Sequence, residues 1–463
     1  MPSGAAQKLF GTDGIRGVAG RFPLDVETVR LIGQSLVNNL VREIGRSPRI
    51  VIGRDTRESG PDIERAIASG AMDAGAQVVS AGVITTPGVA YVTRADDFDA
   101  GVVISASHNP YSDNGIKVFS PTGKKLADEM ERRIEEDLAD VDSLRLQDQV
   151  GARGGSKVVD AYENREAAYH EKYVNYLAEQ VGGPLRLDGL RIALDCANGA
   201  ASGLAPRLFK RLGAQVEVTC ASPDGRNINE GCGSLHLEGL QRVVLEGGLD
   251  LGIAFDGDAD RALFVDSAGA LVDGDAVILA LADYMKSRDR LAGNAVVATV
   301  MSNIGLELAL RERSIELVRA QVGDRYVLEE LLARGGKLGG EQSGHIIFPD
   351  ISLAGDGMIT ALELLRVIRD SGRPLSALAS QMTKYPQVLV NVRVRSKPPL
   401  ESLPEVKAEV DRLENELQGR GRLLVRYSGT ENLARVMMEG EDQAGIEERA
   451  SRLAEIIKGA IGE

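Results

Sequence analysis

The chain has 463 residues, of which 43% are hydrophobic and 26% charged, and this is the composition of a globular protein with roughly three or four domains. Its net charge of −14 argues against nucleic acid or a membrane surface as a partner, although a local basic cluster can still bind an anionic substrate. The three cysteines lack metal-ligand spacing and predict reduced thiols. Since no signal core or membrane-length apolar run is evident, we expect a cytoplasmic protein.

Three segments repeat one pattern: an apolar strand, a Gly-containing turn, a helix and a second apolar strand. They span residues 49–79, 191–218 and 295–318. This order is typical of βαβ units, and parallel strands that are buried on both faces explain the continuous apolar runs. The sequence therefore predicts three α/β domains of similar architecture.

The segment Ile104–Pro110 presents a serine at the end of a predicted strand, because an apolar run precedes it and Asn-Pro forces a turn. Ser107, with His108 beside it, is placed as a nucleophile or phosphate carrier would be. Ser105 is a close competitor, and a plain turn serine is the structural alternative. A tight turn then returns the chain, which could bring Lys117 beside the hydroxyl as proton carrier or phosphate contact.

An acidic loop with Asp256, Asp258 and Asp260 follows another apolar run. At this spacing the three carboxylates face one way on extended backbone, and they repel one another unless a cation neutralises them. Hard oxygen ligands suit Mg²⁺. An EF-hand is excluded because Arg261 and Ser267 stand where it requires Gly and Glu. An aspartyl-phosphate nucleophile at Asp256 and a solvated acidic loop remain alternatives.

A Gly-rich segment, residues 339–345, precedes a short apolar run. Glu341, Ser343 and His345 alternate along it, so they can project into one cleft. This mixture of donors and acceptors suits sugar hydroxyls or an amine, while a plain Gly-rich hairpin is the structural alternative.

The last part of the chain, about 80 residues, follows a different pattern, in which apolar and polar residues alternate as in a half-exposed antiparallel strand. Strands are expected at residues 388–394, 422–426 and 434–439, and helices at 402–417 and 447–461. We therefore predict a small C-terminal α+β domain. The four predicted domains are residues 1–160, 161–267, 268–384 and 385–463.

A candidate phosphate-binding turn joins two of these C-terminal strands. Arg426, Ser428 and Thr430 supply a guanidinium and two hydroxyls, and Gly429 permits close approach of the backbone. Arg435 could add a second guanidinium. The structural alternative is a turn with a salt-bridged rim.

Four motifs in chain order resemble those of the α-D-phosphohexomutase superfamily. They are Ser105–Pro110, Asp256–Arg261, Gly340–His345 and Arg426–Glu431. Further segments are similar to the phosphoglucosamine mutase branch: residues 10–17, 227–229 and 322–327, and Gln342. The resemblance implies four domains around a central cleft. Three of them would have mixed α/β sheets, which corrects the all-parallel interpretation, and the fourth would cap the cleft and grip phosphate.

The resemblance also selects Ser107 over Ser105 as a phosphoserine. It implies that glucosamine 6-phosphate and glucosamine 1-phosphate are interconverted through a bound glucosamine 1,6-bisphosphate, which supplies amino-sugar nucleotide and peptidoglycan precursors. One Mg²⁺ per chain would be held by Ser107, Asp256, Asp258 and Asp260, while Lys117, His108 and Arg16 would handle protons and charge. The implied substrate-binding residues are Arg261, Glu341, Ser343, His345, Arg426, Ser428, Gly429, Thr430 and Arg435.

Three other functions compete with this hypothesis. The nearest is a phosphomannomutase or phosphoglucomutase of the same superfamily. A metal-dependent phosphatase with Asp256 as nucleophile has no need of a second phosphate cradle, and a non-catalytic sugar-phosphate sensor has no need of Ser107 and Lys117. We expect a small hexosamine phosphate as partner, a kinase or autophosphorylation as the source of the first phosphate, and a monomer or homodimer.

Overall fold

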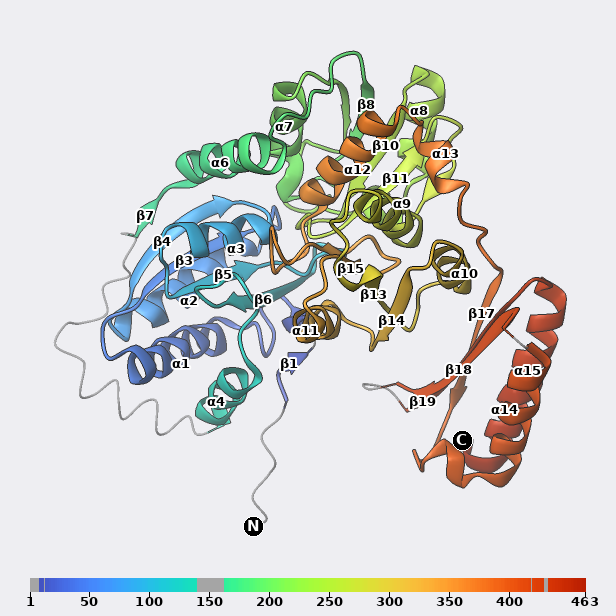
Figure 1. Cartoon of the computed structure of the whole chain (residues 1–463). Helices are drawn as coiled ribbons and strands as arrows, with labels where there is room; N and C mark the ends of the chain where they lie inside the picture. The colour runs from blue at the N-terminus through green and yellow to red at the C-terminus, as the bar shows by residue number, and fades with distance from the viewer. Residues whose placement is uncertain (1–7, 12, 140–161, 418, 429–431) are drawn as a thin grey trace, which may run out of the picture. The chain divides into compact units, whose positions relative to one another are not determined.

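A computed structural model describes residues 8–11, 13–139, 162–417, 419–428 and 432–463. The chain forms two compact units, of which the larger comprises Met1–Val300 and Val318–Ala379 and the smaller comprises Met301–Leu317 and Ser380–Glu463 (Figure 1). The larger unit contains two complete sheets and most of a third, and the smaller unit contains one sheet of its own.

The first sheet has seven strands in the order β1-β2-β6-β5-β3-β4-β7. Their bounds are Phe10–Gly11, Gly14–Val18, Arg49–Arg54, Gln77–Val83, Ala100–Ile104, Asp113–Phe119 and Glu163–Asn164 for β1 to β7. Strand β3 runs parallel to β4 and β5, whereas β6 is antiparallel to both β5 and β2. The sheet is therefore mixed.

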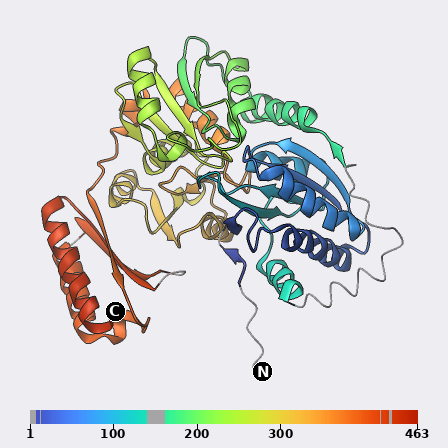
Figure 2. The same ribbon diagram turned by 180° about the vertical axis from the view of Figure 1, so that it is seen from behind.

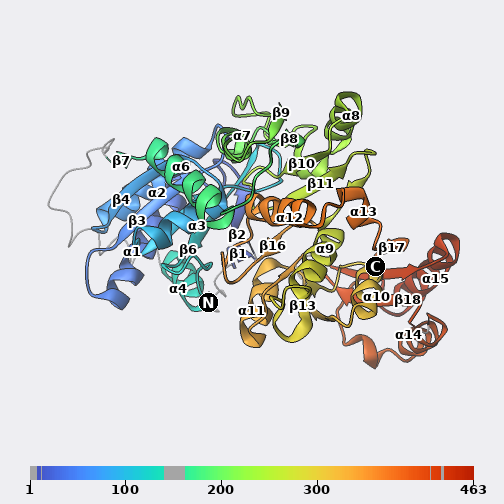
Figure 3. The same ribbon diagram turned by 45° about the horizontal axis from the view of Figure 1, so that its top comes forward.

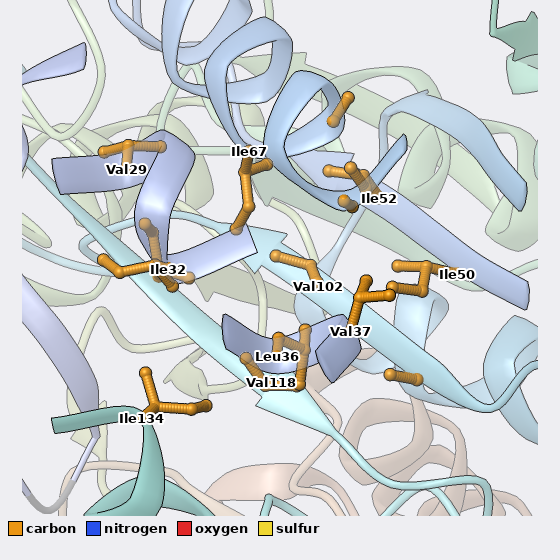
Figure 4. Close-up of a cluster of buried hydrophobic side chains, with 14 of the residues drawn as sticks. Val29, Ile32, Leu36, Val37, Ile50, Ile52, Ile67, Val102, Val118 and Ile134 are labelled. Atoms are coloured by element: carbon orange, nitrogen blue, oxygen red, sulfur yellow. The ribbon is translucent and has the colours of Figure 1, made fainter. Parts of the chain in front are cut away.

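Helices cover this first sheet, and their apolar residues form its core. The helices are α1 (Val26–Ile44), α2 (Gly60–Asp73), α3 (Thr86–Ala95) and α4 (Asp128–Ala139). Side chains of α1 meet those of the strands in one buried cluster, in which Ile32, Leu36 and Val37 pack near Ile50 and Val102 (Figure 4). The side chain of Asp25 accepts the backbone N–H of Thr28 and so begins α1 as an N-cap.

The second sheet has five strands in the order β12-β11-β10-β8-β9. Their bounds are Arg191–Asp195, Gln215–Thr219, Leu251–Phe255, Ala262–Asp266 and Leu271–Val272 for β8 to β12. Its helices are α7 (Ala205–Arg211) and α8 (Glu238–Gly247), while α6 (Glu166–Asn175), which continues as a π-helix over Tyr176–Val181, contacts β4 of the first sheet. β8 is parallel to β9 and β10, whereas β11 is antiparallel to β10, so this sheet is also mixed.

The third sheet has four strands in the order β14-β13-β15-β16. Their bounds are Ala295–Thr299, Glu316–Ala320, Gly339–Gly340 and Ile346–Ile347 for β13 to β16. The associated helices are α9 (Gly274–Lys286), α10 (Ile304–Glu312), α11 (Asp324–Arg334), α12 (Gly357–Ser371) and α13 (Leu375–Ala379). Figure 3 shows α9 beside α12, and these two helices are in contact. α10 belongs to the smaller unit.

The smaller unit is built on an antiparallel sheet in the order β17-β19-β18. Its strands are Gln387–Arg393, Gly421–Tyr427 and Leu433–Gly440, and its helices α14 and α15 are Pro404–Leu417 and Gln443–Ile461. The two helices lie side by side (Figure 2). Residues of α15 such as Leu453 and Ile457 form a core with Val436 and Met438 of β19.

The three predicted repeats correspond to β3-α2-β4, β8-α7-β9 and β13-α10-β14, and the predicted C-terminal strands and helices are also found. The predicted fold class, three α/β domains with mixed sheets and a separate C-terminal α+β domain, is thus confirmed. The four predicted domain limits stay a prediction; the one near residue 160 lies outside the described residues, and Asp266–Gly269 is a hairpin turn between β11 and β12. None of the described helices is long and apolar enough to cross a membrane.

Candidate active site

The Ser107 hydroxyl lies directly on the acidic loop. Ser107 follows the end of β5, is 1% exposed, and has a φ of 52°, a left-handed conformation that residues other than Gly seldom adopt. Its Oγ donates to Asp256 Oδ2 at 2.5 Å and lies 3.3 Å from Nδ1 of His108. Ser105 faces its own loop instead, because its Oγ accepts the Ser107 backbone N–H at 2.9 Å. Ser107 is therefore the candidate serine that contacts the acidic loop.

The acidic loop follows β10 and brings its three carboxylates together. One oxygen from each of Asp256, Asp258 and Asp260 lies within 4.8 Å of the others, and all three side chains are buried. They converge through a turn in which Ala259 N–H donates to Asp256 O at 3.0 Å, so the predicted extended backbone is wrong although the predicted convergence is found. The three carboxylates can converge without the alternation of side chains along a strand, because a tight turn also brings residues two positions apart close together.

This set of residues fits a divalent cation. Oδ1 of Asp258 and Oδ1 of Asp260 are buried, and neither makes a hydrogen bond with any residue that the structure describes. A buried carboxylate oxygen without a hydrogen-bonding partner is costly unless a cation binds it. The donors are hard oxygens, as Mg²⁺ requires.

The main cation beside the acidic loop is Lys117 on β6. Its Nζ lies 2.9 Å from Asp258 Oδ2, 3.0 Å from Asp13 Oδ2 and 3.3 Å from Asp260 Oδ2, and the residue is 1% exposed. Burial alone would lower the pKa of Lys117, but these carboxylates outweigh it and raise that pKa well above its usual value. Lys117 is therefore a charged ammonium in this arrangement. The chain returns Lys117 to the acidic loop that the Ser107 hydroxyl contacts, and a direct role of Lys117 at that hydroxyl stays a prediction.

The carboxyl groups of the acidic loop differ in their ionisation. Burial raises the pKa of Asp256 well above its usual value, and the negative charges of Asp260 and Asp258 raise it further. Burial also opposes ionisation of Asp260, but Lys117 and His345 outweigh it and hold the pKa of Asp260 well below the usual range. The carboxyl group that lacks a nearby lysine is thus the one that accepts the Ser107 hydroxyl.

A cleft of about 430 Å³ adjoins this cluster, a volume that suits a small ligand. Its lining residues come from five separate segments: Leu9, Gly11, Asp13, Gly14, Arg16, His108, Asp260, Arg261, Val322, Gly323, Asp324, Glu341 and His345. The cleft thus brings together Arg16, His108 and Arg261 as predicted. Burial, then Arg261 and Arg16, lowers the pKa of His108 to about 4, so its imidazole is neutral at pH 7.

The Gly-rich segment after β15 contributes two of its three predicted side chains to the cleft. Glu341 Oε1 accepts the Gly323 backbone N–H at 3.2 Å. His345 lies 3.6 Å from a carboxylate oxygen of Asp260, and although burial opposes its charge, that carboxylate and Asp324 raise the pKa of His345 to about 9. Ser343 is not among the cleft residues, and its Oγ is buried without a hydrogen bond to any described residue.

The smaller unit carries the candidate phosphate cradle. Arg426 on β18 and Arg435 on β19 are direct partners in the antiparallel ladder, so both side chains lie on the same face of the sheet. Burial and the charge of Arg435 lower the pKa of Arg426. Ser428 is buried after the end of β18, and its carbonyl accepts a hydrogen bond from Lys397 Nζ at 2.8 Å. Gly429 and Thr430 lie outside the described residues.

Three charged residues of the site were missed by the sequence interpretation. Lys125 Nζ lies 2.5 Å from Asp13 Oδ1 and 2.8 Å from Asp324 Oδ2, which links the N-terminal segment to α11. Burial raises the pKa of Asp13, but Lys117 and Lys125 outweigh it and hold that pKa well below its usual range. The signals for Asp13 and Asp324 were the Gly-rich segment 10–17 and the segment 322–327, neither of which reveals its partners in space.

Comparison with family models covers almost the whole chain. The models of phosphoglucomutase/phosphomannomutase domains I, II and III match residues 7–145, 171–269 and 273–385, and the model of the C-terminal domain matches residues 389–456. The chain therefore belongs to the phosphoglucomutase/phosphomannomutase family.

Individual proteins give a finer comparison. The chain is 50% identical over 459 residues to a phosphoglucosamine mutase from Solibacter usitatus, with 99% of this chain and 100% of the relative covered. It is 48% identical over 459 residues to a phosphoglucosamine mutase from Koribacter versatilis, with 98% of each covered. A solved phosphoglucomutase/phosphomannomutase family protein from Burkholderia thailandensis shares the fold, with a TM-score of 0.79, 24% identity and 98% of each chain covered. The predicted family and enzyme class, a phosphohexomutase, are confirmed, and the predicted function agrees with the names of these relatives.

Proposed function

We propose that this chain interconverts glucosamine 6-phosphate and glucosamine 1-phosphate and so supplies precursors of amino-sugar nucleotides and the cell wall. The observation that carries the proposal is the contact between the Ser107 hydroxyl and Asp256, inside a buried cluster that also holds Lys117. The full-length likeness to relatives named phosphoglucosamine mutase supports the choice of sugar. The reaction is expected in the cytoplasm, and the three cysteines carry free thiols.

Ser107 is proposed as the phosphoryl carrier. In the first half of the reaction the bond between Ser107 Oγ and phosphorus breaks, and a bond forms from the free sugar hydroxyl to the same phosphorus, which yields bound glucosamine 1,6-bisphosphate. In the second half the intermediate has turned over, and its other phosphate returns to Ser107. Lys117 and His108 are our candidates for moving the hydroxyl proton, and Arg16 is a candidate for balancing charge.

Asp256, Asp258, Asp260 and a phosphoserine oxygen on Ser107 are proposed to hold one Mg²⁺ per chain. Such an ion, when bound, would neutralise charge on the transferring phosphoryl group. The two buried carboxylate oxygens without hydrogen bonds support this donor set. Arg261 lies in the same cleft and adds a fixed positive charge. Burial alone would lower the pKa of Arg261, but the carboxylates of Asp260 and Asp256 outweigh burial and raise that pKa.

We assign the sugar and the phosphate that is not reacting to two different sets of binding residues. Glu341 offers an anionic acceptor for the ammonium of the sugar, and His345 serves its hydroxyls. Ser343, which is not among the residues that line the cleft, is left out of this proposal. The phosphate that is not reacting would be held by Arg426, Ser428, Gly429, Thr430 and Arg435. The first phosphate on Ser107 would come from a kinase or from autophosphorylation, and a monomer or homodimer is expected.

The experiment that tests this function compares kcat/KM of the purified protein, primed with a hexose 1,6-bisphosphate, on glucosamine 1-phosphate, glucose 1-phosphate and mannose 1-phosphate. We expect the amino sugar to be preferred, because the Glu341 carboxylate in the cleft would pair with an ammonium better than with a neutral hydroxyl. Equal or higher efficiency on a neutral sugar would instead favour a phosphomannomutase or phosphoglucomutase. Phosphate found on Asp256 rather than Ser107 by peptide mass spectrometry would favour the phosphatase.

A further inference from the structure

We propose that Arg57 and Asn229 are positioning residues for catalysis, which hold the backbone of the phosphoserine loop from two different domains. The inference rests on the proposed role of Ser107 as phosphoryl carrier. Asn229 Nδ2 donates to Ser107 O at 2.9 Å and to Asn109 O at 3.0 Å. Arg57 Nη2 donates to the same two carbonyl oxygens, at 3.2 Å and 2.5 Å. Two side chains thus converge on one pair of acceptors, on either side of His108.

Arg57 is itself fixed in place. It follows β3 in the first domain, and its side chain is 0% exposed. One guanidinium nitrogen, Nη1, pairs with the buried carboxylate of Asp55, which also accepts the Arg57 backbone N–H at 3.0 Å. A buried guanidinium is costly unless it is paired and hydrogen-bonded, and its rigid planar shape lets one end pair with Asp55 while the other donates to the loop.

Asn229 reaches the same carbonyls from the second domain. It lies in the loop between β9 and α8, has a φ of 60°, and donates its backbone N–H to Ala197 O at 2.9 Å. The side chain of Asn227, two residues earlier, bonds within this loop instead, because its Nδ2 donates to Ser222 O at 3.0 Å. The two asparagines therefore have separable roles, one in the loop's own structure and one in contact with the phosphoserine loop.

The position of the Ser107 carbonyl determines where its hydroxyl points. Ser107 is held in a left-handed conformation that is strained in a non-Gly residue, and surrounding contacts must maintain it. The acidic loop also packs against this carbonyl, since a Cβ on Gly257 would lie 2.5 Å from Ser107 O. Releasing the carbonyl would let Oγ shift relative to the acidic loop, and a misplacement of about 1 Å can cost about 100-fold in rate.

The test measures phosphoryl transfer to Ser107 separately from sugar turnover. Dephosphorylated protein is mixed with glucose 1,6-bisphosphate, and the gain of phosphate is followed by intact mass. For Asn229→Ala we expect a transfer rate and kcat about 10–100-fold lower, with KM within about twofold. Arg57→Lys keeps the charge beside Asp55 but loses the planar donor, and we expect about a 10-fold loss. Asn227→Ala is the matched control and should retain transfer within about threefold.

A double-mutant cycle separates joint from independent action. Because Arg57 and Asn229 share both acceptors, the double variant should be slower than the slower single variant by no more than about threefold. The proposal would be overturned if the loss of transfer rate in the double variant equalled the product of the two single losses. It would also be overturned if Asn227→Ala and Asn229→Ala lost the same activity, or if Asn229→Ala transferred phosphate at the wild-type rate. Wild-type turnover of glucosamine phosphates tests the proposed function separately, since glucose 1,6-bisphosphate reports on the loop whatever sugar is preferred.

Discussion

The two candidate phosphate sites of this protein are built in opposite ways. Ser107, Lys117 and the acidic loop lie in the larger unit, fully buried, and join three segments that are distant in the sequence. Arg426 and Arg435 lie in the smaller unit, on two strands of one local ladder. The first arrangement suits a reacting phosphoryl group, because buried, preoriented charges stabilise a transition state without reorganising. The second suits recognition, which needs only charge and hydrogen-bond donors on one face.

Like charges are gathered in both sites, but with different consequences. In the larger unit Lys117 offsets part of the charge of the crowded carboxylates, and buried oxygens of Asp258 and Asp260 that make no hydrogen bond with a described residue are donors of the kind that a divalent cation takes. In the smaller unit two guanidiniums face each other across a ladder, where like charges destabilise the sheet. An anion that binds both would relieve that repulsion. The comparison therefore predicts that damage to the first site lowers kcat, whereas damage to the second raises KM.

The largest effect is expected from Ser107→Ala. Removing the carrier oxygen should abolish turnover, because no other group in the cleft is proposed to accept the phosphoryl group. Ser105→Ala is the matched control, since it removes a hydroxyl two residues away that bonds the loop backbone, and it should leave measurable activity. Turnover that survives in Ser107→Ala, or phosphate trapped on another residue, would show that the buried site is not where the chemistry occurs.

A smaller but still large effect is expected from Asp258→Asn. Losing one carboxylate should lower both Mg²⁺ affinity, measured by calorimetry, and kcat by at least about 100-fold, since even outer partners of metal ligands cost 10–100-fold. Asp266→Asn is the control, because that buried carboxylate accepts the backbone N–H groups of Ala268 and Ala270. Full activity after exhaustive chelation of the wild type would refute the metal assignment.

Arg426→Ala should separate the second site from the first. Loss of a charge-assisted hydrogen bond to phosphate, about 1.5–3 kcal/mol, should raise KM about 10–100-fold with a smaller change in kcat. Arg420→Ala, an exposed position just before the same strand, removes the same charge and should leave KM within about twofold. If both variants raise KM equally, the cradle acts only through the general field of the domain.

The smallest effect that we expect is on the pH dependence of the stability of the larger unit. Burial raises the pKa of Asp356, the N-cap of α12, to about 6, so this group favours the folded state at low pH. That contribution is lost as pH rises from about 4 to about 6, at a cost of up to about 3 kcal/mol. Asp356→Asn should therefore raise the melting temperature by a few degrees at pH 7 relative to wild type, and less at pH 4, because Asn still caps the helix.

Asp25 at the start of α1 provides a control of opposite sign. Burial raises its pKa slightly, but hydrogen bonds from Thr28 outweigh that and lower it, so the carboxylate stabilises the fold above about pH 4. Asp25→Asn should therefore lower the melting temperature at pH 7 and have less effect near pH 3. Identical responses of the two variants would mean that helix capping, rather than burial of charge, governs both positions.

The sequence predicted which residues form the buried site better than it predicted how they are arranged in space. Ser107 and the acidic loop were identified because each follows an apolar strand and carries side chains suited to phosphoryl transfer or metal binding. The two strands, β5 and β10, belong to different sheets, so neither local pattern encodes the contact between Ser107 and Asp256. The expectation that Ser343 projects into the same cleft as Glu341 and His345 assumed an extended backbone. Instead a turn interrupts the segment, in which Gly344 has a φ of 88° and donates its backbone N–H to Glu341 O. The contact of Lys125 with Asp13 joins residues far apart in the sequence, and no local pattern encodes such a partner.

The antiparallel pairing of β5 with β6 limits how the chain can change in length. Val103 is opposite Lys117 in that ladder, so Ser107 and Lys117 belong to one hairpin. Side chains alternate between the faces of a strand, so a shift of register by one residue turns every side chain to the opposite face. A single-residue insertion or deletion between Ser107 and Lys117 that shifts this register would carry the ammonium away from the acidic loop. The number of residues in the connection is therefore constrained as tightly as their identity.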